Sequence, residues 1–298
     1  MNFSAESLGL AGTVTSIFCD LIHERLGLSY DAAQFAQVGD RLAPLVVERG
    51  LGSFMDYYYL LKYSDDADEW RKVMDALAVP ETYFWREVDQ VMAMVDCVMP
   101  ILAARADGRP IRIWSVPCSS GEEPLTIAML LDDRGWFARA DIEIVASDGS
   151  PAAIAKARSG VYSGRAFRTL PPAMRDRYFQ PEGGSKWTVS PDLHRRVRYD
   201  IVNLMDVASV AARAAVPVIF CRNVFIYFSD RNIDQVVKTF ARSMPSPAFL
   251  CVGASESLLR FSTPFDLQEI GGAFVYVKGD ADPAPHPLAA LANGERIR

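Results

Sequence analysis

The 298-residue chain has no apolar run as long as the ~18–20 residues that a membrane-spanning helix needs. Its first residues also lack a basic segment followed by an apolar stretch, the pattern of a secretory signal. We therefore expect a soluble, cytoplasmic protein with no membrane insertion. Half of the residues are hydrophobic, which supplies a sizeable buried core and excludes global disorder.

Cysteine and histidine are scarce. The five cysteines are an odd number with no Cys-X-X-Cys pair, which argues against both a disulfide framework and a zinc cluster. The three histidines lie far apart, and none has a partner at metal-ligand spacing. We therefore expect no metal site.

The chain also lacks a basic block, which argues against tight nucleic-acid binding, because such binding depends on neutralising phosphates. The net charge is −6, and residues 1–78 account for it with twelve Asp and Glu against six Lys and Arg. The acidic run 65–69 is typical of a solvated helix start, where carboxylates are favourable.

Residues 1–80 are predicted to form a small helical domain. Apolar residues recur there at three- and four-residue spacing up to Gly50. Ser53 and Asp56 form a capping-box pattern before the next helix. A further helix from about Asp66 must end before Pro80.

Residues 81–280 are predicted to form an α/β domain with a mainly parallel, doubly wound sheet. After a helical pattern over 86–108, apolar strand-like runs alternate with helical patterns. The run 273–278 is expected to add an antiparallel edge strand, and the Pro- and Ala-rich residues 281–298 a flexible tail. The expected strands are 111–116, 142–147, 217–221 and 248–253, and the helices lie at about 122–134, 151–158 and 230–244.

Residues 180–202 interrupt this alternation. Two short strand-like pieces and three closely spaced arginines lie there. The pattern favours a small β-hairpin inserted into the α/β domain over a plain connecting loop.

The loop 117–124 after the first strand carries Glu122 and Glu123 and leads into a helix. Ligands meet an open α/β sheet at this edge. Neither a Gly-X-Gly-X-X-Gly fingerprint nor a P-loop is present, and two carboxylates would repel a pyrophosphate. The loop suits a positively charged ligand without phosphates, such as S-adenosylmethionine; a capped helix start is an equally good interpretation.

Polar side chains also follow two other predicted strands. Asp148 follows the predicted strand 142–147 and is placed to accept hydrogen bonds from both ribose hydroxyls of an adenosine. A helix cap is its alternative role, but Ser150 before Pro151 already supplies that cap. Arg222 and Asn223 follow the predicted strand 217–221 and face the same crevice. Tyr227 either directs its hydroxyl toward that crevice or packs in the core.

Together these motifs resemble the CheR-type chemotaxis receptor methyltransferases, S-adenosylmethionine-dependent enzymes that methylate glutamate side chains of bacterial chemoreceptors. The resemblance covers about residues 10–280, and the seven motifs occur in the family's order. They are Glu81–Glu87 (Thr-X-Phe-Phe-Arg-Glu in the family), Cys118–Pro124, Ala146–Asp148, Ala157–Tyr162, Asn203–Leu204, Phe220–Phe228 and Gly253–Ser257.

The resemblance implies a class I (Rossmann-like) methyltransferase domain with S-adenosylmethionine as cofactor and S-adenosylhomocysteine as product. It implies a monomer whose partner is the cytoplasmic helical region of a chemoreceptor. The implied catalytic residues are Arg86, near the methionine carboxylate and reacting centre, and Tyr227. The implied cofactor-binding residues are Thr82, Arg86, Glu123 (at the amino group), Asp148 (at the ribose), Asn203 and Leu204 (flanking the adenine), Arg222 and Asn223.

The sequence departs from the family in several respects. Pro80 stands where the family often has asparagine, and Trp85 replaces the second phenylalanine of the motif. The helical domain of well-known members presents basic residues to acidic receptor helices, whereas here the domain is net acidic.

A carboxylate acceptor needs no general base, because glutamate with its pKa of ~4.3 is ionised at neutral pH. Arg86 and Tyr227 are therefore expected to orient the reactants rather than to transfer protons. Two alternatives stay open. One is a methyltransferase for a small molecule or nucleic acid. The net negative charge of the chain and the lack of an Asn-Pro-Pro-Tyr motif argue against methylation of nucleic-acid bases. The other is a non-catalytic adaptor, opposed by the retained cofactor residues.

Overall fold

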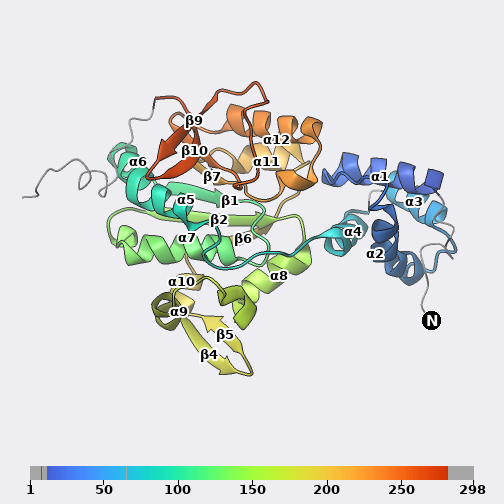
Figure 1. Ribbon diagram of the computed structural model, residues 1–298, viewed down its shortest axis with the longest axis horizontal. Helices are drawn as coiled ribbons and strands as arrows, with labels where there is room; N and C mark the ends of the chain where they lie inside the picture. The colour runs from blue at the N-terminus through green and yellow to red at the C-terminus, as the bar shows by residue number, and fades with distance from the viewer. Residues whose placement is uncertain (1–7, 9–11, 65, 281–298) are drawn as a thin grey trace, which may run out of the picture.

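The computed structural model describes residues 8, 12–64 and 66–280 (Figure 1). The predicted tail 281–298 lies outside the described residues. No helix among those described is long and apolar enough to cross a membrane.

The N-terminal part is a bundle of four helices, at the right of Figure 1. They are α1 (Gly12–Leu26), α2 (Phe35–Glu48), α3 (Phe54–Tyr63) and α4 (Ala67–Leu77). Ser53 caps α3 by accepting the backbone N–H of Asp56, and the helix that starts at Asp66 ends before Pro80, so the predicted helix boundaries are confirmed. The bundle buries its own core around Phe18, Leu42, Phe54 and Leu61.

The acidic run at the start of α4 is only partly a solvated helix start. Asp66 caps the helix as expected, accepting the N–H groups of Asp68 and Glu69. Glu69 itself is fully buried, which the sequence interpretation did not foresee. Its carboxylate accepts hydrogen bonds from Tyr57 Oη at 2.8 Å and Arg49 Nε at 2.7 Å. The charge is tolerated because these partners replace the lost hydration.

The large sheet of the second part has seven strands in the order β6-β2-β1-β7-β8-β10-β9. The first five are parallel, and four of them, β1, β2, β7 and β8, are the predicted parallel strands; β10 and β9 are antiparallel. The strands are β1 (Ile111–Ser115), β2 (Ile142–Asp148), β6 (Val197–Ile201), β7 (Val218–Phe220), β8 (Ala248–Cys251), β9 (Phe265–Ile270) and β10 (Ala273–Lys278).

Helices cover both faces of this sheet. On one face lie α5 (Val88–Ala93), a π-helical turn (Met94–Val98), α6 (Met99–Arg105), α7 (Glu122–Asp133) and α8 (Pro151–Ser159). On the other lie α11 (Val207–Arg213) and α12 (Asp230–Ser243). Neighbouring residues of β1 pack on opposite faces of the sheet. Ile113 lies in the core beneath α5, α6, α7 and α8, and Trp114 lies in the core beneath α11 and α12.

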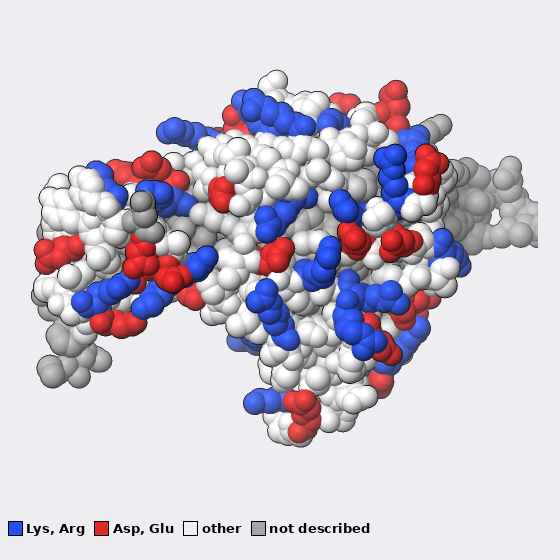
Figure 2. All heavy atoms as spheres, turned by 180° about the vertical axis from the view of Figure 1, so that it is seen from behind, with Lys and Arg blue, Asp and Glu red and all other residues white. Residues whose placement is uncertain are grey.

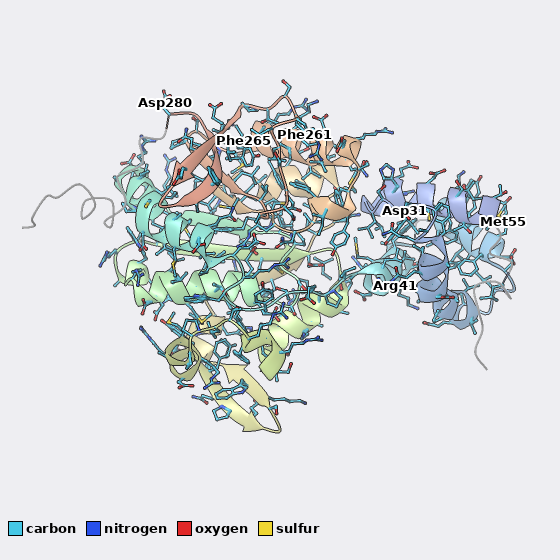
Figure 3. All side chains as sticks on the ribbon, in the orientation of Figure 1. Asp31, Arg41, Met55, Phe261, Phe265 and Asp280 are labelled. Carbon is cyan, nitrogen blue, oxygen red and sulfur yellow. The ribbon has the colours of Figure 1, made fainter. Side chains whose placement is uncertain are left out.

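Two predicted strand assignments need correction. The strand at 273–278 is antiparallel but does not form the edge, because β9 pairs along its outer side and buries Phe265 (labelled in Figure 3). Residues 197–201 lie not in the inserted hairpin but in the main sheet, as the parallel edge strand β6. The alternation of Val197 and Tyr199 inward with Arg198 outward fits an edge, and such a short mixed run is hard to distinguish from a hairpin strand.

The inserted hairpin itself is present and larger than expected. The strands β4 (Phe179–Gly183) and β5 (Lys186–Val189) form it, and β3 (Val161–Ser163) adds a third strand to give the order β3-β5-β4. Three short helices accompany this small sheet: a 3₁₀ turn (Gly164–Phe167), α9 (Pro172–Tyr178) and α10 (Pro191–His194). The insertion therefore begins near Val161 rather than at 180.

Replacing Glu69 by alanine should lower the free energy of unfolding by about 2–4 kcal/mol, because it leaves the buried Tyr57 hydroxyl and the Nε of Arg49 without their acceptor. Urea unfolding measures this. Asp68→Ala in the same turn is the matched control: its side chain is 82% exposed, and we expect a change below about 0.5 kcal/mol. Equal losses for both variants would contradict the assigned role of Glu69.

Candidate active site

A cavity of about 390 Å³ opens at the carboxyl ends of β1, β2 and β7, where the strand order reverses. The segment 78–86, which leads from α4 to α5, forms one wall, and residues of α1 and α4 form another. The cavity brings together all nine residues named from the sequence: Thr82, Arg86, Glu123, Asp148, Asn203, Leu204, Arg222, Asn223 and Tyr227.

The loop after β1 places Glu123 at the cavity. Gly121 precedes α7 with φ of +94°, and a Cβ there would lie 3.0 Å from Tyr162 Oη, so only glycine fits this close approach. Glu123 follows in the first turn of α7, and its carboxylate accepts a hydrogen bond from Ser115 Oγ at 2.7 Å. Burial raises the pKa of Glu123, although the charge of Arg222 opposes the shift.

Asp148 ends β2 with both carboxylate oxygens held by the backbone. Oδ2 accepts the N–H of Ser119 at 2.8 Å, and Oδ1 accepts the N–H of Ser150 at 2.9 Å. Burial raises the pKa of this carboxyl despite these hydrogen bonds. Ser150 caps α8 by accepting the N–H of Ala153, as predicted, so the side chain of Asp148 is not needed as that cap. Each oxygen retains a lone pair for a ligand hydroxyl.

Arg222 follows β7 and is buried, with a side chain only 2% exposed. Its Nη2 lies 3.2 Å from Glu87 Oε2 and donates to the carbonyl of Arg86 at 2.8 Å, while Nη1 lies 3.4 Å from Glu123 Oε2. Its Nε has no hydrogen-bond partner among the described residues. Arg222 also lines the cavity, so its guanidinium is part of the cavity wall.

Glu87 is a residue for which the sequence suggested no role, although it lies in a quoted motif. It has a left-handed φ of 45°, and its carboxylate accepts from Asn223 Nδ2 at 3.3 Å and from the N–H of Ala254 at 3.0 Å. Burial by itself would raise the pKa of Glu87, but the charge of Arg222 and these hydrogen bonds lower it overall. Glu87 therefore stays ionised and joins the 81–87 segment to the ends of β7 and β8.

Glu256 shapes the loop after β7, and sequence reasoning also missed this role. Its carboxylate accepts four backbone N–H groups, those of Gly253 at 2.7 Å, Asn223 at 2.8 Å, Phe225 at 2.6 Å and Ile226 at 3.3 Å. Asn223 is held there with a φ of +59°. One side chain thus determines the path of the backbone that carries Arg222, Asn223 and Tyr227.

The helical domain closes the side of the cavity near Tyr227. The backbone N–H of Ser29 donates to the carbonyl of Tyr227 at 2.8 Å. The buried Asn232 on α12 donates through Nδ2 to the carbonyls of His23 and Gly27 at the end of α1. Tyr227 is half-buried and lines the cavity, so the interpretation as a residue facing the crevice is favoured over a core position.

Asn203 has a structural role in addition to its predicted one. Its Nδ2 donates to the carbonyl of Arg25 at 2.7 Å, and its Oδ1 accepts the N–H of Met205 at 3.0 Å. The side-chain amide is thus engaged in holding the helical domain. Leu204 beside it is buried and supplies apolar lining.

Arg86 and Thr82 line the wall formed by the segment that links the two domains. Arg86 donates through Nη1 to the carbonyl of Glu81 at 2.8 Å, and its Nε lies 3.8 Å from Glu87 Oε1. Pro80 lines the cavity as well, at the position where the sequence departs from the family.

The cavity has the chemistry expected for a cationic ligand that carries no phosphate. Glu123 and Asp148 present carboxylates, and Arg86 and Arg222 supply guanidinium groups that can pair with a ligand carboxylate. A parallel α/β sheet with such a site at its switch point is the arrangement of an S-adenosylmethionine-dependent methyltransferase.

Comparison with known proteins agrees with this class and narrows it. Residues 80–272 match the model of the CheR methyltransferase SAM binding domain, and residues 16–78 match the model of the CheR methyltransferase all-alpha domain. The chain belongs to the CheR methyltransferase family.

Among its relatives, chemotaxis protein methyltransferase 2 of Vibrio cholerae is 33% identical over 88% of this chain and 91% of that protein. The chemotaxis protein methyltransferase of Vibrio parahaemolyticus is 31% identical over 87% and 94%. The probable biofilm formation methyltransferase WspC of Pseudomonas putida is 32% identical over 94% of this chain but only 65% of that protein.

We expect Glu256→Ala to lower the affinity for S-adenosylmethionine by roughly tenfold and the free energy of unfolding by about 2–3 kcal/mol, because four backbone donors lose their acceptor. Calorimetric titration and urea unfolding provide the two readouts. Glu269→Ala on β9, where the residue is exposed, is the control and should change neither. A Glu256→Ala protein with unaltered affinity would show that this carboxylate does not position the site.

Proposed function

We propose that this protein transfers the methyl group of S-adenosylmethionine to glutamate side chains of chemoreceptors. Its partner is the cytoplasmic helical region of a receptor, and the enzyme acts in the cytoplasm as a monomer. The observation that carries this proposal is the single cavity shared by all nine family-type residues, within a chain that matches both CheR domains. Relatives that match most of this chain are named chemotaxis protein methyltransferases.

The cavity residues divide into groups that fit different parts of the cofactor. The carboxylate of Asp148 is assigned to the ribose hydroxyls and that of Glu123 to the amino group, because each is fixed and retains free lone pairs. Arg86 and Arg222, two of the cations that line the cavity, are assigned to the methionine carboxylate. Asn203 and Leu204 flank the adenine, and since the amide of Asn203 is engaged with Arg25, its contribution is through the backbone. Thr82 and Asn223 complete the wall.

The reaction does not require the protein to supply a general base. S-adenosylmethionine supplies an activated methyl group to an attacking carboxylate oxygen. The protein has to align the acceptor and exclude water, and the helical domain contributes by closing the cavity over Tyr227. A cation held tightly against the attacking oxygen would reduce its nucleophilicity, so Arg86 and Tyr227 are assigned the orientation of the reactants.

The decisive experiment incubates the purified protein with methyl-tritiated S-adenosylmethionine and membranes that contain the host's chemoreceptors. We expect label in the receptor band that is released by base, because methyl esters of carboxylates are base-labile. Label on free metabolites but not on protein would overturn the proposal in favour of a small-molecule enzyme. Cofactor binding without any transfer to these receptors would favour a docking protein.

Two conservative variants test the catalytic assignment in the same assay. Tyr227→Phe and Arg86→Lys should each lower the rate of transfer by roughly tenfold or more, since each removes an orienting contact. Full turnover with unchanged cofactor affinity in both variants would show that these roles are wrong.

The raised pKa values of Asp148 and Glu123 predict a pH dependence of cofactor binding. Both assignments need ionised carboxylates. Below the raised pKa each group must lose a proton before it binds, so affinity should fall as the pH is lowered, by up to about tenfold per pH unit for each group. The fall in affinity should begin at a pH above the ordinary pKa values of these side chains, which are 3.8 for Asp148 and 4.5 for Glu123.

Calorimetry over a pH series measures this. Asp148→Asn should bind more weakly at neutral pH and lose affinity less steeply on acidification. A wild-type Kd that stays constant down to the ordinary carboxyl range would contradict the assignment of both carboxylates.

A further inference from the structure

The basic residues of the helical domain are engaged within that domain. Five of the six donate hydrogen bonds to a neighbouring side chain or carbonyl, as Arg41 (labelled in Figure 3) does to the carbonyl of Leu77. The sixth, Arg25, lies over the ring of Trp70. Figure 2 shows acidic and basic side chains interleaved over this domain. The remaining donors are Arg49, Lys62, Arg71 and Lys72.

The part of the chain from α8 to α9 has the opposite charge balance. Residues 156–177 contain six basic residues and one acidic residue, Asp176. Three of the six have carbonyl or carboxylate partners away from the cavity mouth: Arg158 with the carbonyl of Tyr199, Arg175 with Asp176, and Arg177 with Asp132 and Asp133. Arg165 has no hydrogen-bond or ion-pair partner among the described residues, and it is exposed.

Arg165 and Arg168 lie on a segment that packs against the cavity wall. The N–H of Phe84 donates to the carbonyl of Ala166 at 2.9 Å, and Thr169 Oγ1 donates to the carbonyl of Phe84 at 2.7 Å. These bonds hold the 3₁₀ turn Gly164–Phe167 beside the Thr82–Arg86 stretch. The basic side chains are therefore positioned by rigid backbone rather than by a free loop.

A chain of contacts joins this surface to Arg86. The guanidinium carbon of Arg168 lies 3.7 Å from the centroid of the Tyr83 ring, and that of Arg86 lies 5.7 Å from the same centroid. Tyr83 itself lines the cavity. Arg168 also pairs with Glu81 at 2.7 Å, where Arg168 first, then Arg165 and Arg86, lower the pKa of the Glu81 carboxyl. Arg168, Arg165 and Arg86 thus lie near one exposed carboxylate, that of Glu81, which lines the cavity.

We propose that Arg165 and Arg168, with the Tyr83 ring, bind carboxylates that flank the acceptor glutamate on the receptor. This rests on the proposed function. It assigns recognition of an acidic acceptor segment to the methyltransferase domain. The Arg168–Glu81 pair is compatible with this role, because exposed pairs are worth little and a carboxylate of the acceptor can replace Glu81.

The test is steady-state methyl transfer to receptor-containing membranes at varied receptor concentration. Arg165→Glu should raise the receptor KM by roughly three- to tenfold and weaken its dependence on salt, with kcat and the Kd for S-adenosylmethionine unchanged. An unchanged cofactor Kd also shows that the variant is folded. Arg168→Gln, which keeps length but removes the charge, should raise the same KM.

Two charge reversals elsewhere serve as controls. One is Arg195→Glu, at the C-terminal end of α10, where the arginine side chain is 72% exposed. The other is Arg71→Glu in the helical domain, where the arginine side chain is 50% exposed. Both should leave the receptor KM unchanged. The proposal is overturned if Arg165→Glu matches wild type, or if Arg71→Glu raises the KM as much. If the wild-type protein transfers no methyl group to receptors, both the proposed function and this inference fail. If the wild-type protein transfers methyl groups but Arg165→Glu has an unaltered receptor KM, only this inference fails.

Discussion

The buried guanidinium of Arg222 is the interaction on which the rest of the site depends. Removing such a charge from water costs several kcal/mol unless carboxylates and carbonyls surround it. Glu87, Glu123 and the carbonyl of Arg86 supply these partners from two different segments of the chain. The end of β7, the 81–87 segment and the first turn of α7 are therefore held together by one electrostatic requirement.

The second constraint is the contact between the two domains. The end of α1 contacts α12 through Asn232 and the η5 turn (Phe225–Tyr227) through Ser29, and on the opposite side Asp75 of α4 accepts a hydrogen bond from Ser150 Oγ at 2.5 Å. Most of these bonds involve backbone groups or caps and therefore fix orientation as well as distance. The helical domain is thus a wall of the site, and its charged side chains are largely used within it. Under the proposed recognition by Arg165 and Arg168, the acidic helical domain does not need to present cations to the receptor.

Local patterns predicted the elements that follow local rules. The helix starts at Ser53 and Ser150, the parallel strands and the small hairpin all appeared where capping residues and apolar runs indicated them. Strand neighbours were harder, since β6 and β9 are short and of mixed polarity, and pairing depends on a partner distant in the sequence. Glu69, Glu87 and Glu256 were missed as structural hydrogen-bond acceptors for a similar reason. A glutamate near a helix start or after a strand is ordinarily solvated, and only the groups packed around it make it structural.

The sequence by itself determined the class of the protein, the order of its elements and the residue types at the carboxyl ends of the strands, because these follow from periodicity, caps and motifs within short windows. The tertiary structure decided which of those residues share a cavity, which carboxylates are buried and which cations remain available to a partner. Those properties depend on distances between segments more than a hundred residues apart, as between Glu87 and Arg222. Burial, and with it the pKa of each carboxyl, is set by the whole fold.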